Sequence, residues 1–268
     1  MQVLTGGARD GSHRGMIQQR IRALAAVAAL TVAHPAEAMV GGGGAPSPAV
    51  ASAIVTIVGS HGTSCTGTLI ARDIVLTAAH CVAPGTAYKM VDYKSQPPRL
   101  LDVRRAVTHP QFNMQSLLAH RATADVALLQ LAAPVSASSA ALGGALMPVA
   151  PGQRLTVVGM GVAVRGDGRS GGVARAASLA VTGRPGTLQI RLADPLTHNA
   201  RAGLGACTGD SGAPAFLDSN RGSVIIGVVS WSTGPNNASG CGGLTGVTPL
   251  ALYRDWILRT ARSWGAGI

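Results

Sequence analysis

The sequence has 268 residues, of which 36 are glycine and only 12% are charged. This composition favours many short strands and tight turns over a helical bundle or a disordered tail, in one large domain or two small ones. The net charge is +11, but the basic residues are scattered, and three Trp, three Tyr and two Phe are few for a nucleic-acid stacking surface. We therefore expect no specific nucleic-acid partner.

The first 38 residues differ from the rest. Arginines precede an apolar run at 23–33, and a small-x-small sequence ends at Ala38. This order predicts a secretory signal peptide over 1–38, with Met1 or Met16 as the start. The apolar run falls well short of the roughly 20 residues of a membrane anchor, so we expect a secreted protein, extracellular or periplasmic, without a membrane span.

Short apolar and β-branched runs predict strands along the rest of the chain. A first group lies at 54–58, 68–70, 74–77, 104–107 and 126–131, and a second at 155–159, 188–192, 213–217 and 224–230. The Ala-, Ser- and Pro-rich stretch 132–147 predicts the crossing between the two groups. We expect one protease-sized domain at 39–268, with halves at about 39–135 and 145–248.

The end of the chain predicts one helix, at 249–262. Thr248 can cap it, Pro249 suits its first turn, and apolar residues recur at helical spacing from Leu250 to Ala261.

Three segments carry residues suited to nucleophilic catalysis. His80 ends the run Leu-Thr-Ala-Ala-His, Asp125 opens Asp-Val-Ala-Leu-Leu, and Ser211 lies in Gly-Asp-Ser-Gly-Ala-Pro at 209–214. The glycines of this last turn can expose the serine hydroxyl and aim backbone N–H groups at one point. A serine nucleophile needs a base near neutral pH, and a histidine base needs a carboxylate to fix its tautomer. The three residues therefore predict a catalytic triad.

The four cysteines form an even set, which predicts disulfides in an exported chain. Three sets of pairs can be drawn, and proximity in the sequence favours Cys65 with Cys81 and Cys207 with Cys241. The chain has no Cys-x-x-Cys spacing, and no glutamate follows Glu37 to build a calcium loop. We expect neither a metal nor another cofactor.

The three catalytic segments resemble those of the trypsin/chymotrypsin-like serine proteases, with Ala213 where that family usually has a second glycine. The resemblance runs from about Met39 to the end of the chain. It implies an all-β fold, two six-stranded antiparallel β-barrels packed together with a C-terminal α-helix, and it supports the same two disulfide pairs.

The resemblance also implies a role for each site residue. Ser211 would attack the scissile carbonyl, His80 would take its proton, and Asp125 would orient His80. The backbone N–H groups of Gly209 and Ser211 would form the oxyanion hole. Ser230 would donate a hydrogen bond to Asp125.

A substrate pocket is implied beside the serine. Its floor would be Gly205 and Ala206, where no acid is present to pair with Lys or Arg. Its walls would come from Ser230, Trp231, Ser232 and Gly246. Ser232 stands where the family usually has glycine and would narrow the entrance. We predict cleavage after an uncharged, small-to-medium apolar residue, the P1 residue of the substrate.

The segment Met39-Val40-Gly41-Gly42 resembles the family's activated N-terminus, and Asp210 is the matching acid. We hypothesise that removal of 1–38 exposes Met39 directly, so that its amine pairs with Asp210 without a separate propeptide. The alternative is a plain flexible N-terminus and an oxyanion hole that needs no activation.

Together these features predict a secreted, monomeric serine endopeptidase that acts on polypeptides, with a protein protease inhibitor as a further candidate partner. A catalytically silent relative that serves as a binding protein is one alternative, although such relatives usually lose a triad residue. An esterase with the same triad is another, but Ala213 breaks the Gly-x-Ser-x-Gly elbow.

Overall fold

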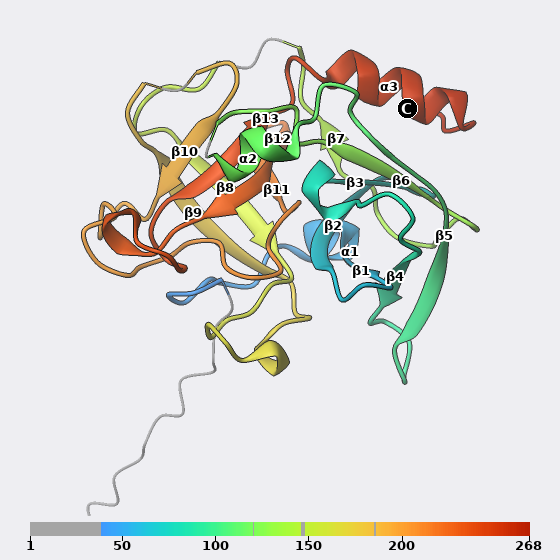
Figure 1. Ribbon diagram of the computed structural model, residues 1–268, viewed down its shortest axis with the longest axis horizontal. Helices are drawn as coiled ribbons and strands as arrows, with labels where there is room; N and C mark the ends of the chain where they lie inside the picture. The colour runs from blue at the N-terminus through green and yellow to red at the C-terminus, as the bar shows by residue number, and fades with distance from the viewer. Residues whose placement is uncertain (1–38, 120, 146–147, 185) are drawn as a thin grey trace, which may run out of the picture. The chain divides into compact units, whose positions relative to one another are not determined.

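Six antiparallel strands close into a first barrel in the order β1-β2-β3-β6-β5-β4 (Figure 1). They are β1 (Ile54–Gly59), β2 (Ser64–Ala71), β3 (Ile74–Thr77), β4 (Tyr88–Asp92), β5 (Arg99–Thr108) and β6 (Ala127–Leu131). The computed structural model describes residues 39–119, 121–145, 148–184 and 186–268. The predicted signal peptide lies outside these residues.

A second ring of six antiparallel strands follows in the order β11-β8-β9-β10-β13-β12, closed by the pairing of β11 with β12. These strands are β8 (Arg154–Gly159), β9 (Arg175–Val181), β10 (Ile190–Ala193), β11 (Pro214–Ser219), β12 (Gly222–Ser232) and β13 (Thr245–Pro249). The short β7 (Ala141–Leu142) adds a parallel pairing to β12. The expected fold, two six-stranded antiparallel barrels with a C-terminal helix, is confirmed.

The core lies inside each barrel and between the two. Successive side chains of a strand point to opposite faces. In β3, Val75 therefore packs inside the first barrel, while Ile74 and Leu76 pack in a separate cluster with Val158 and Phe216 of the second barrel. Because both faces are covered, β3 and β6 are buried along their whole length. This contact places the ends of first-barrel strands beside second-barrel loops.

The helices of the described residues are short: α1 (Pro48–Ala53), α2 (Met114–Leu118) and α3 (Arg254–Ser263), with 3-10 turns η1 (Ala79–Cys81), η2 (Gly168–Ser170) and η3 (Pro235–Asn237). None of them is long and apolar enough to cross a membrane. The C-terminal α3 lies beside β6 (Figure 1). Its Tyr253 N-cap and Trp256 each place a ring 4.9 Å from the ring of His109, and Ile257 is buried in the cluster between the barrels.

The predicted helix start at 249 is wrong. Thr248 and Pro249 end β13, where they pair with Val228 and Gly227 of β12, and the helix begins only at Arg254. Strand pairing keeps this stretch extended, so the cap and proline signals at 248–249 are overridden by tertiary contacts.

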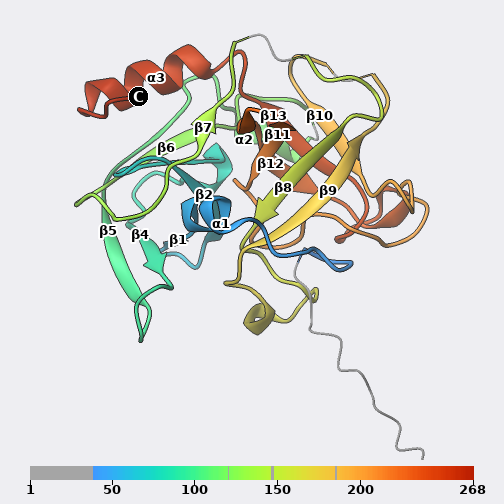
Figure 2. The ribbon, with the colours of Figure 1, turned by 180° about the vertical axis from the view of Figure 1, so that it is seen from behind.

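The segment 39–44 packs on the second barrel although it precedes the first (Figure 2). Val40 forms an antiparallel bridge with Gly205, and Gly44 forms another with Ala176. Met39 is fully buried in the core of the second barrel. Gly41 has a φ of +95°, and a Cβ there would lie 2.4 Å from the backbone of Gly203. Residues 39–44 therefore belong with the second half of the domain rather than with the expected first half.

Candidate active site

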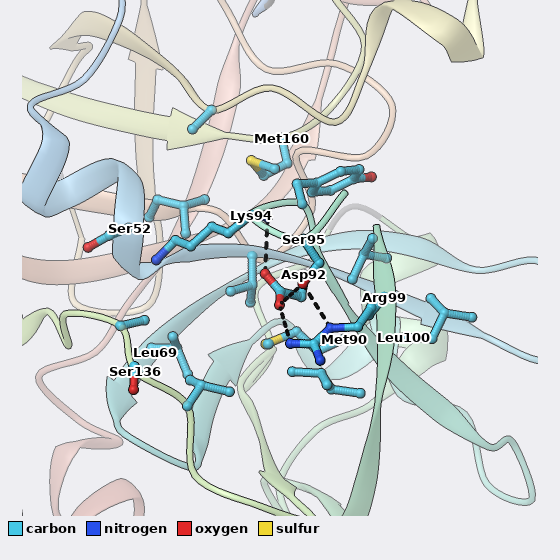
Figure 3. Close-up of a pocket in the computed structure, with 18 of the residues that line it drawn as sticks. Ser52, Leu69, Met90, Asp92, Lys94, Ser95, Arg99, Leu100, Ser136 and Met160 are labelled. Carbon is cyan, nitrogen blue, oxygen red and sulfur yellow. Dashed lines mark hydrogen bonds and ion pairs between the residues drawn. The ribbon is translucent and has the colours of Figure 1, made fainter. Parts of the chain in front are cut away.

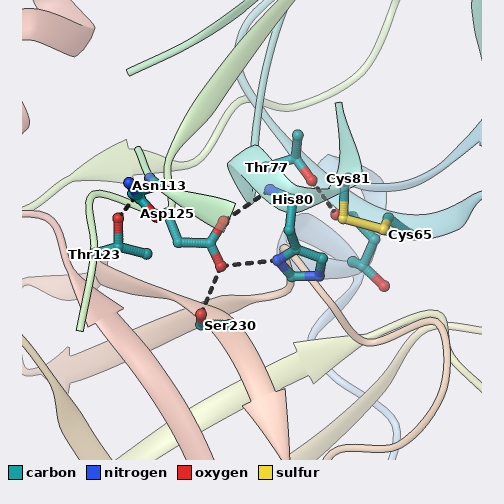
Figure 4. A network of polar contacts seen from close by, with 9 residues as sticks. Cys65, Thr77, His80, Cys81, Asn113, Thr123, Asp125 and Ser230 are labelled. Carbon is teal, nitrogen blue, oxygen red and sulfur yellow. Dashed lines mark hydrogen bonds and ion pairs between the residues drawn. A yellow bond between two sulfur atoms is a disulfide. The ribbon is translucent and has the colours of Figure 1, made fainter. Parts of the chain in front are cut away.

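His80 and Asp125 are joined by two hydrogen bonds at the edge of the first barrel (Figure 4). His80 lies in η1 directly after β3, and Asp125 lies two residues before β6, the strand that pairs with β3. The backbone N–H of His80 donates to Asp125 Oδ1 at 2.8 Å, and its ring Nδ1 lies 2.8 Å from Asp125 Oδ2. These contacts fix the ring and leave Nε2 as its outward nitrogen.

Ser230, in β12 of the second barrel, completes this network. Its hydroxyl donates to Asp125 Oδ2 at 2.5 Å. Asp125 is fully buried, and a buried carboxylate without partners would be strongly destabilising. Three donors converge on it here, so it can stay in place beside a histidine whose side chain is 19% exposed.

The loop carrying Ser211 is hydrogen-bonded to residues 161 and 162, which follow β8. Asp210 is fully buried, and its carboxylate accepts the N–H groups of Gly161 and Cys207, each at 2.9 Å. Burial raises the pKa of Asp210 to about 6, although these two hydrogen bonds and the charge of Arg175 act in the opposite direction. The N–H of Val162 donates to Thr208 O at 2.9 Å.

Ser211 meets the histidine segment through close backbone packing. A Cβ on Gly212 would lie 2.1 Å from Thr77 Oγ1 and 2.9 Å from Ala78 N, so only glycine fits beside the residues that lead to His80. Among the described residues, the Ser211 hydroxyl has no hydrogen-bond partner. The hydrogen bond between a serine nucleophile and its histidine base is often long in a free enzyme and shortens when substrate binds.

Two backbone N–H groups of this loop are available to a ligand. Gly209 has a φ of +91°, which a glycine adopts without strain. Within the part of the chain that the structure describes, neither Gly209 N nor Ser211 N donates a hydrogen bond. Such unpaired donors beside a serine are the groups that an oxyanion hole needs.

The expected pocket floor, Gly205 and Ala206, is buried and carries no acid. The N–H of Ala206 donates to the hydroxyl of Thr245 at 3.0 Å, and Thr245 is fully buried. The nearby buried Asp194 is engaged elsewhere, because its two oxygens accept the N–H groups of Leu196 and Leu204. Neither Thr245 nor Asp194 belongs to a motif that predicts a functional role from the sequence.

The register of β12 and β13 places the expected wall residues Trp231 and Ser232 on opposite faces of the sheet. Trp231 lies opposite Gly246, and a Cβ on Gly246 would lie 2.0 Å from the indole. Ser232 lies opposite Thr245, so their side chains share the other face, the one that reaches Ala206. The place of the Thr245 side chain follows from the pairing of β13 with β12, which no local sequence pattern specifies.

Two disulfides brace the site, Cys65–Cys81 and Cys207–Cys241. The first joins β2 to the turn of His80, and the second joins the residues before Ser211 to the segment before β13. Cys65, His80 and Cys81 place possible ligand atoms within 4.8 Å of one another. Because the two sulfur atoms are bonded together, they cannot serve as thiolate ligands.

A cavity of about 880 Å³ lies away from this site, between α1, β4, β5 and residues 132–137 (Figure 3). On its rim, Asp92 accepts hydrogen bonds from Lys94 N, Ser95 Oγ and Arg99. The Ser95 hydrogen bond, with smaller contributions from Lys94 N and Arg99, lowers the pKa of Asp92. No triad residue lines this cavity.

The sequence model of the family described as Trypsin matches residues 40–257. The chain belongs to the trypsin family of serine peptidases. Among similar family members, trypsin from Phaedon cochleariae is 30% identical, covering 72% of this chain and 77% of its own. Human kallikrein-8 is 27% identical (75% and 78% covered), and cathepsin G from Mus musculus is 28% identical (74% and 75% covered). Membership of the trypsin family implies polypeptide substrates.

Proposed function

We propose that this chain is a secreted serine endopeptidase that cleaves after an uncharged, small-to-medium apolar residue. The observation that carries the proposal is the buried hydrogen-bond network from Ser230 through Asp125 to His80, with the Ser211 loop packed against the same segment. Export is supported by the two disulfides, which persist in oxidising compartments.

In the proposed mechanism, Ser211 Oγ attacks the scissile carbonyl while His80 Nε2 takes its proton. Asp125 stabilises the imidazolium and keeps Nδ1 protonated, but does not itself become protonated. The carbonyl oxygen, now an oxyanion, accepts the N–H groups of Gly209 and Ser211. His80 then gives the proton to the leaving amine, and an acyl-enzyme forms on Ser211. Water releases the acid by the same steps in reverse.

The P1 preference is supported by the chemistry of the pocket floor. Gly205 and Ala206 offer no carboxylate to a Lys or Arg side chain, whose charge would be left unpaired on burial. The hydroxyl of the buried Thr245 accepts the N–H of Ala206, which supports the proposal that its side chain limits the size of the P1 residue. We therefore propose that alanine and valine are preferred over phenylalanine, and all three over arginine.

We further propose that signal-peptide removal after Ala38 matures the enzyme. Support comes from Met39, which is already buried in the core of the second barrel, and from Val40, which is bridged to Gly205 five residues before Asp210. Met39 has a φ of +49°, a strained conformation for a non-glycine residue, and cutting the preceding peptide bond releases that constraint. N-terminal sequencing of the active secreted protein should return Met39; a start within 41–47 would defeat this part of the proposal.

The activity is tested with peptide substrates that differ only at P1, assayed with the wild type and with Ser211→Ala. We expect hydrolysis by the wild type alone, fastest after alanine or valine. Fastest cleavage after arginine or lysine would overturn the specificity. No cleavage of any peptide, with partner binding intact, would instead favour a silent binding protein, and turnover of esters alone would favour an esterase.

A further inference from the structure

Thr66, in β2 of the first barrel, is hydrogen-bonded to the serine loop of the second. We propose that Thr66 is a positioning residue whose hydroxyl holds the Gly209 and Ser211 N–H groups in the geometry that binds the oxyanion. This inference rests on the proposed function, because it concerns how the same site stabilises its transition state.

The hydroxyl of Thr66 connects three distant parts of the chain. Thr66 is fully buried. Its Oγ1 donates to Gly209 O at 2.7 Å and accepts the N–H of Met160 at 3.0 Å. Gly209 lies 143 residues from Thr66 in the sequence, and Met160 lies 94 residues away. The donor and the acceptor of this hydroxyl are thus both used, and both partners belong to the second barrel or the loops beside it.

The backbone of Thr66 makes two further contacts, one to the serine loop and one to Thr77 at the end of β3. Its N–H donates to Ser211 O at 2.9 Å, and its carbonyl accepts Thr77 Oγ1 at 2.8 Å. The preceding residue, Cys65, is disulfide-bonded to Cys81, the neighbour of His80. Thr66 is therefore hydrogen-bonded to the serine loop on both sides of Asp210. It is also linked, through Thr77 and the Cys65–Cys81 disulfide, to the segment that carries His80.

The hydrogen bond from Thr66 to Gly209 O restricts rotation of the peptide group between Gly209 and Asp210. With φ at +91°, Gly209 can adopt several backbone states of similar energy. The carbonyl of the peptide between Gly209 and Asp210 is held by Thr66, and its N–H donates to Cys207 O at 3.0 Å. Rotation of this peptide would carry the neighbouring N–H groups away from a position where donors must lie about 2.7–3.1 Å from the oxyanion.

The same strand offers a direct comparison for this role. Thr68 lies two residues further along β2 and is also fully buried, yet its hydroxyl has no hydrogen-bond partner among the described residues. A buried threonine hydroxyl on this strand is therefore tolerated without a partner. The two hydrogen bonds of Thr66 Oγ1 are particular to its place beside the serine loop, and Thr68→Val is a matched control.

The test compares Thr66→Val, Thr66→Ser and Thr68→Val with the wild type on one peptide substrate. For Thr66→Val we expect kcat to fall about 10- to 100-fold with KM within about twofold, because only the transition state loses its donors. A peptide aldehyde, which forms a tetrahedral adduct with the serine, should lose affinity by a similar factor. The matching alcohol, which cannot form the adduct, should bind as before. Thr66→Ser and Thr68→Val should both stay within about threefold of the wild type.

Equal kinetics for Thr66→Val and Thr68→Val in an active enzyme would overturn this inference alone. Parallel loss of aldehyde and alcohol affinity would also overturn it, because a purely structural role would weaken both. If Thr66→Val does not fold, Thr66→Ala against Thr66→Ser makes the same comparison. A wild type that hydrolyses no peptide, or a Ser211→Ala variant as active as the wild type, would overturn the proposed function itself.

Discussion

The free energy of unfolding should depend on pH in a way that shows whether a free amine at Met39 pairs with the carboxyl group of Asp210. In a chain without a free amine at Met39, burial raises the pKa of Asp210 from its ordinary 3.8 to about 6. An acid whose pKa is higher in the folded state contributes stability below about pH 4, and that contribution is lost as the pH rises through about 6. This rise in the pKa of Asp210 corresponds to a decrease of about 3 kcal/mol in the free energy of unfolding between about pH 4 and pH 7.

A free amine at Met39 should remove this loss. A cation beside a carboxylate favours the charged form of the acid and lowers its pKa, so the pair should remain stable to about pH 7. Arg175 also acts on Asp210, but it is present in both forms and cancels in the comparison. The expected difference between the two forms is therefore about 3 kcal/mol near pH 7 and close to zero near pH 4.

The assay is urea unfolding of residues 39–268 at several pH values, with Ser211→Ala to prevent self-digestion. One sample begins with a free Met39 amine, and the other is acetylated at that amine. Asp210→Asn in both samples should abolish the difference, because it removes the titrating group. Parallel stability curves for the free and acetylated forms would refute the pairing of Met39 with Asp210.

Three further variants test other parts of the site. Thr245→Gly should raise kcat/KM for phenylalanine relative to alanine at P1 by about tenfold or more, since it opens the space under the pocket floor; an unchanged ratio would remove Thr245 from the pocket. Replacing both Cys65 and Cys81 with alanine removes a cross-link spanning 16 residues and should lower stability to urea by about 3 kcal/mol, so an unchanged midpoint would contradict that stabilisation. Ser230→Ala removes one donor from Asp125 and should reduce kcat about tenfold at unchanged KM; full activity would show that this hydrogen bond is dispensable.

The parts of the site that lie in contiguous segments could be predicted from the sequence. His80, Asp125 and Ser211 each lie in a short motif whose residue types suit one chemistry, and the structure joins the first two directly. Their catalytic roles stay predictions. The composition indicates many short strands and tight turns, whereas the two-barrel architecture is implied only by the resemblance of the three catalytic segments to the trypsin/chymotrypsin-like serine proteases.

Other features depend on contacts between distant strands, which local patterns do not encode. Thr245 was missed because the register of β13 against β12 decides which face it occupies. Thr66 was missed because its partners lie 143 and 94 residues away. The resemblance of residues 39–42 to an activated N-terminus implies a link to Asp210, but the bridges from Val40 to Gly205 and from Gly44 to Ala176 depend on distant strands and could not be predicted.

The central claim is that Ser211 is a nucleophile activated by His80, and active-site labelling tests it most directly. A fluorophosphonate probe is added to the wild type, Ser211→Ala and His80→Ala, and the site of any adduct is located by peptide mass spectrometry. The account predicts one adduct on Ser211 in the wild type, much slower labelling of His80→Ala and none of Ser211→Ala. An unlabelled wild type, or equal labelling of Ser211→Ala, would contradict it.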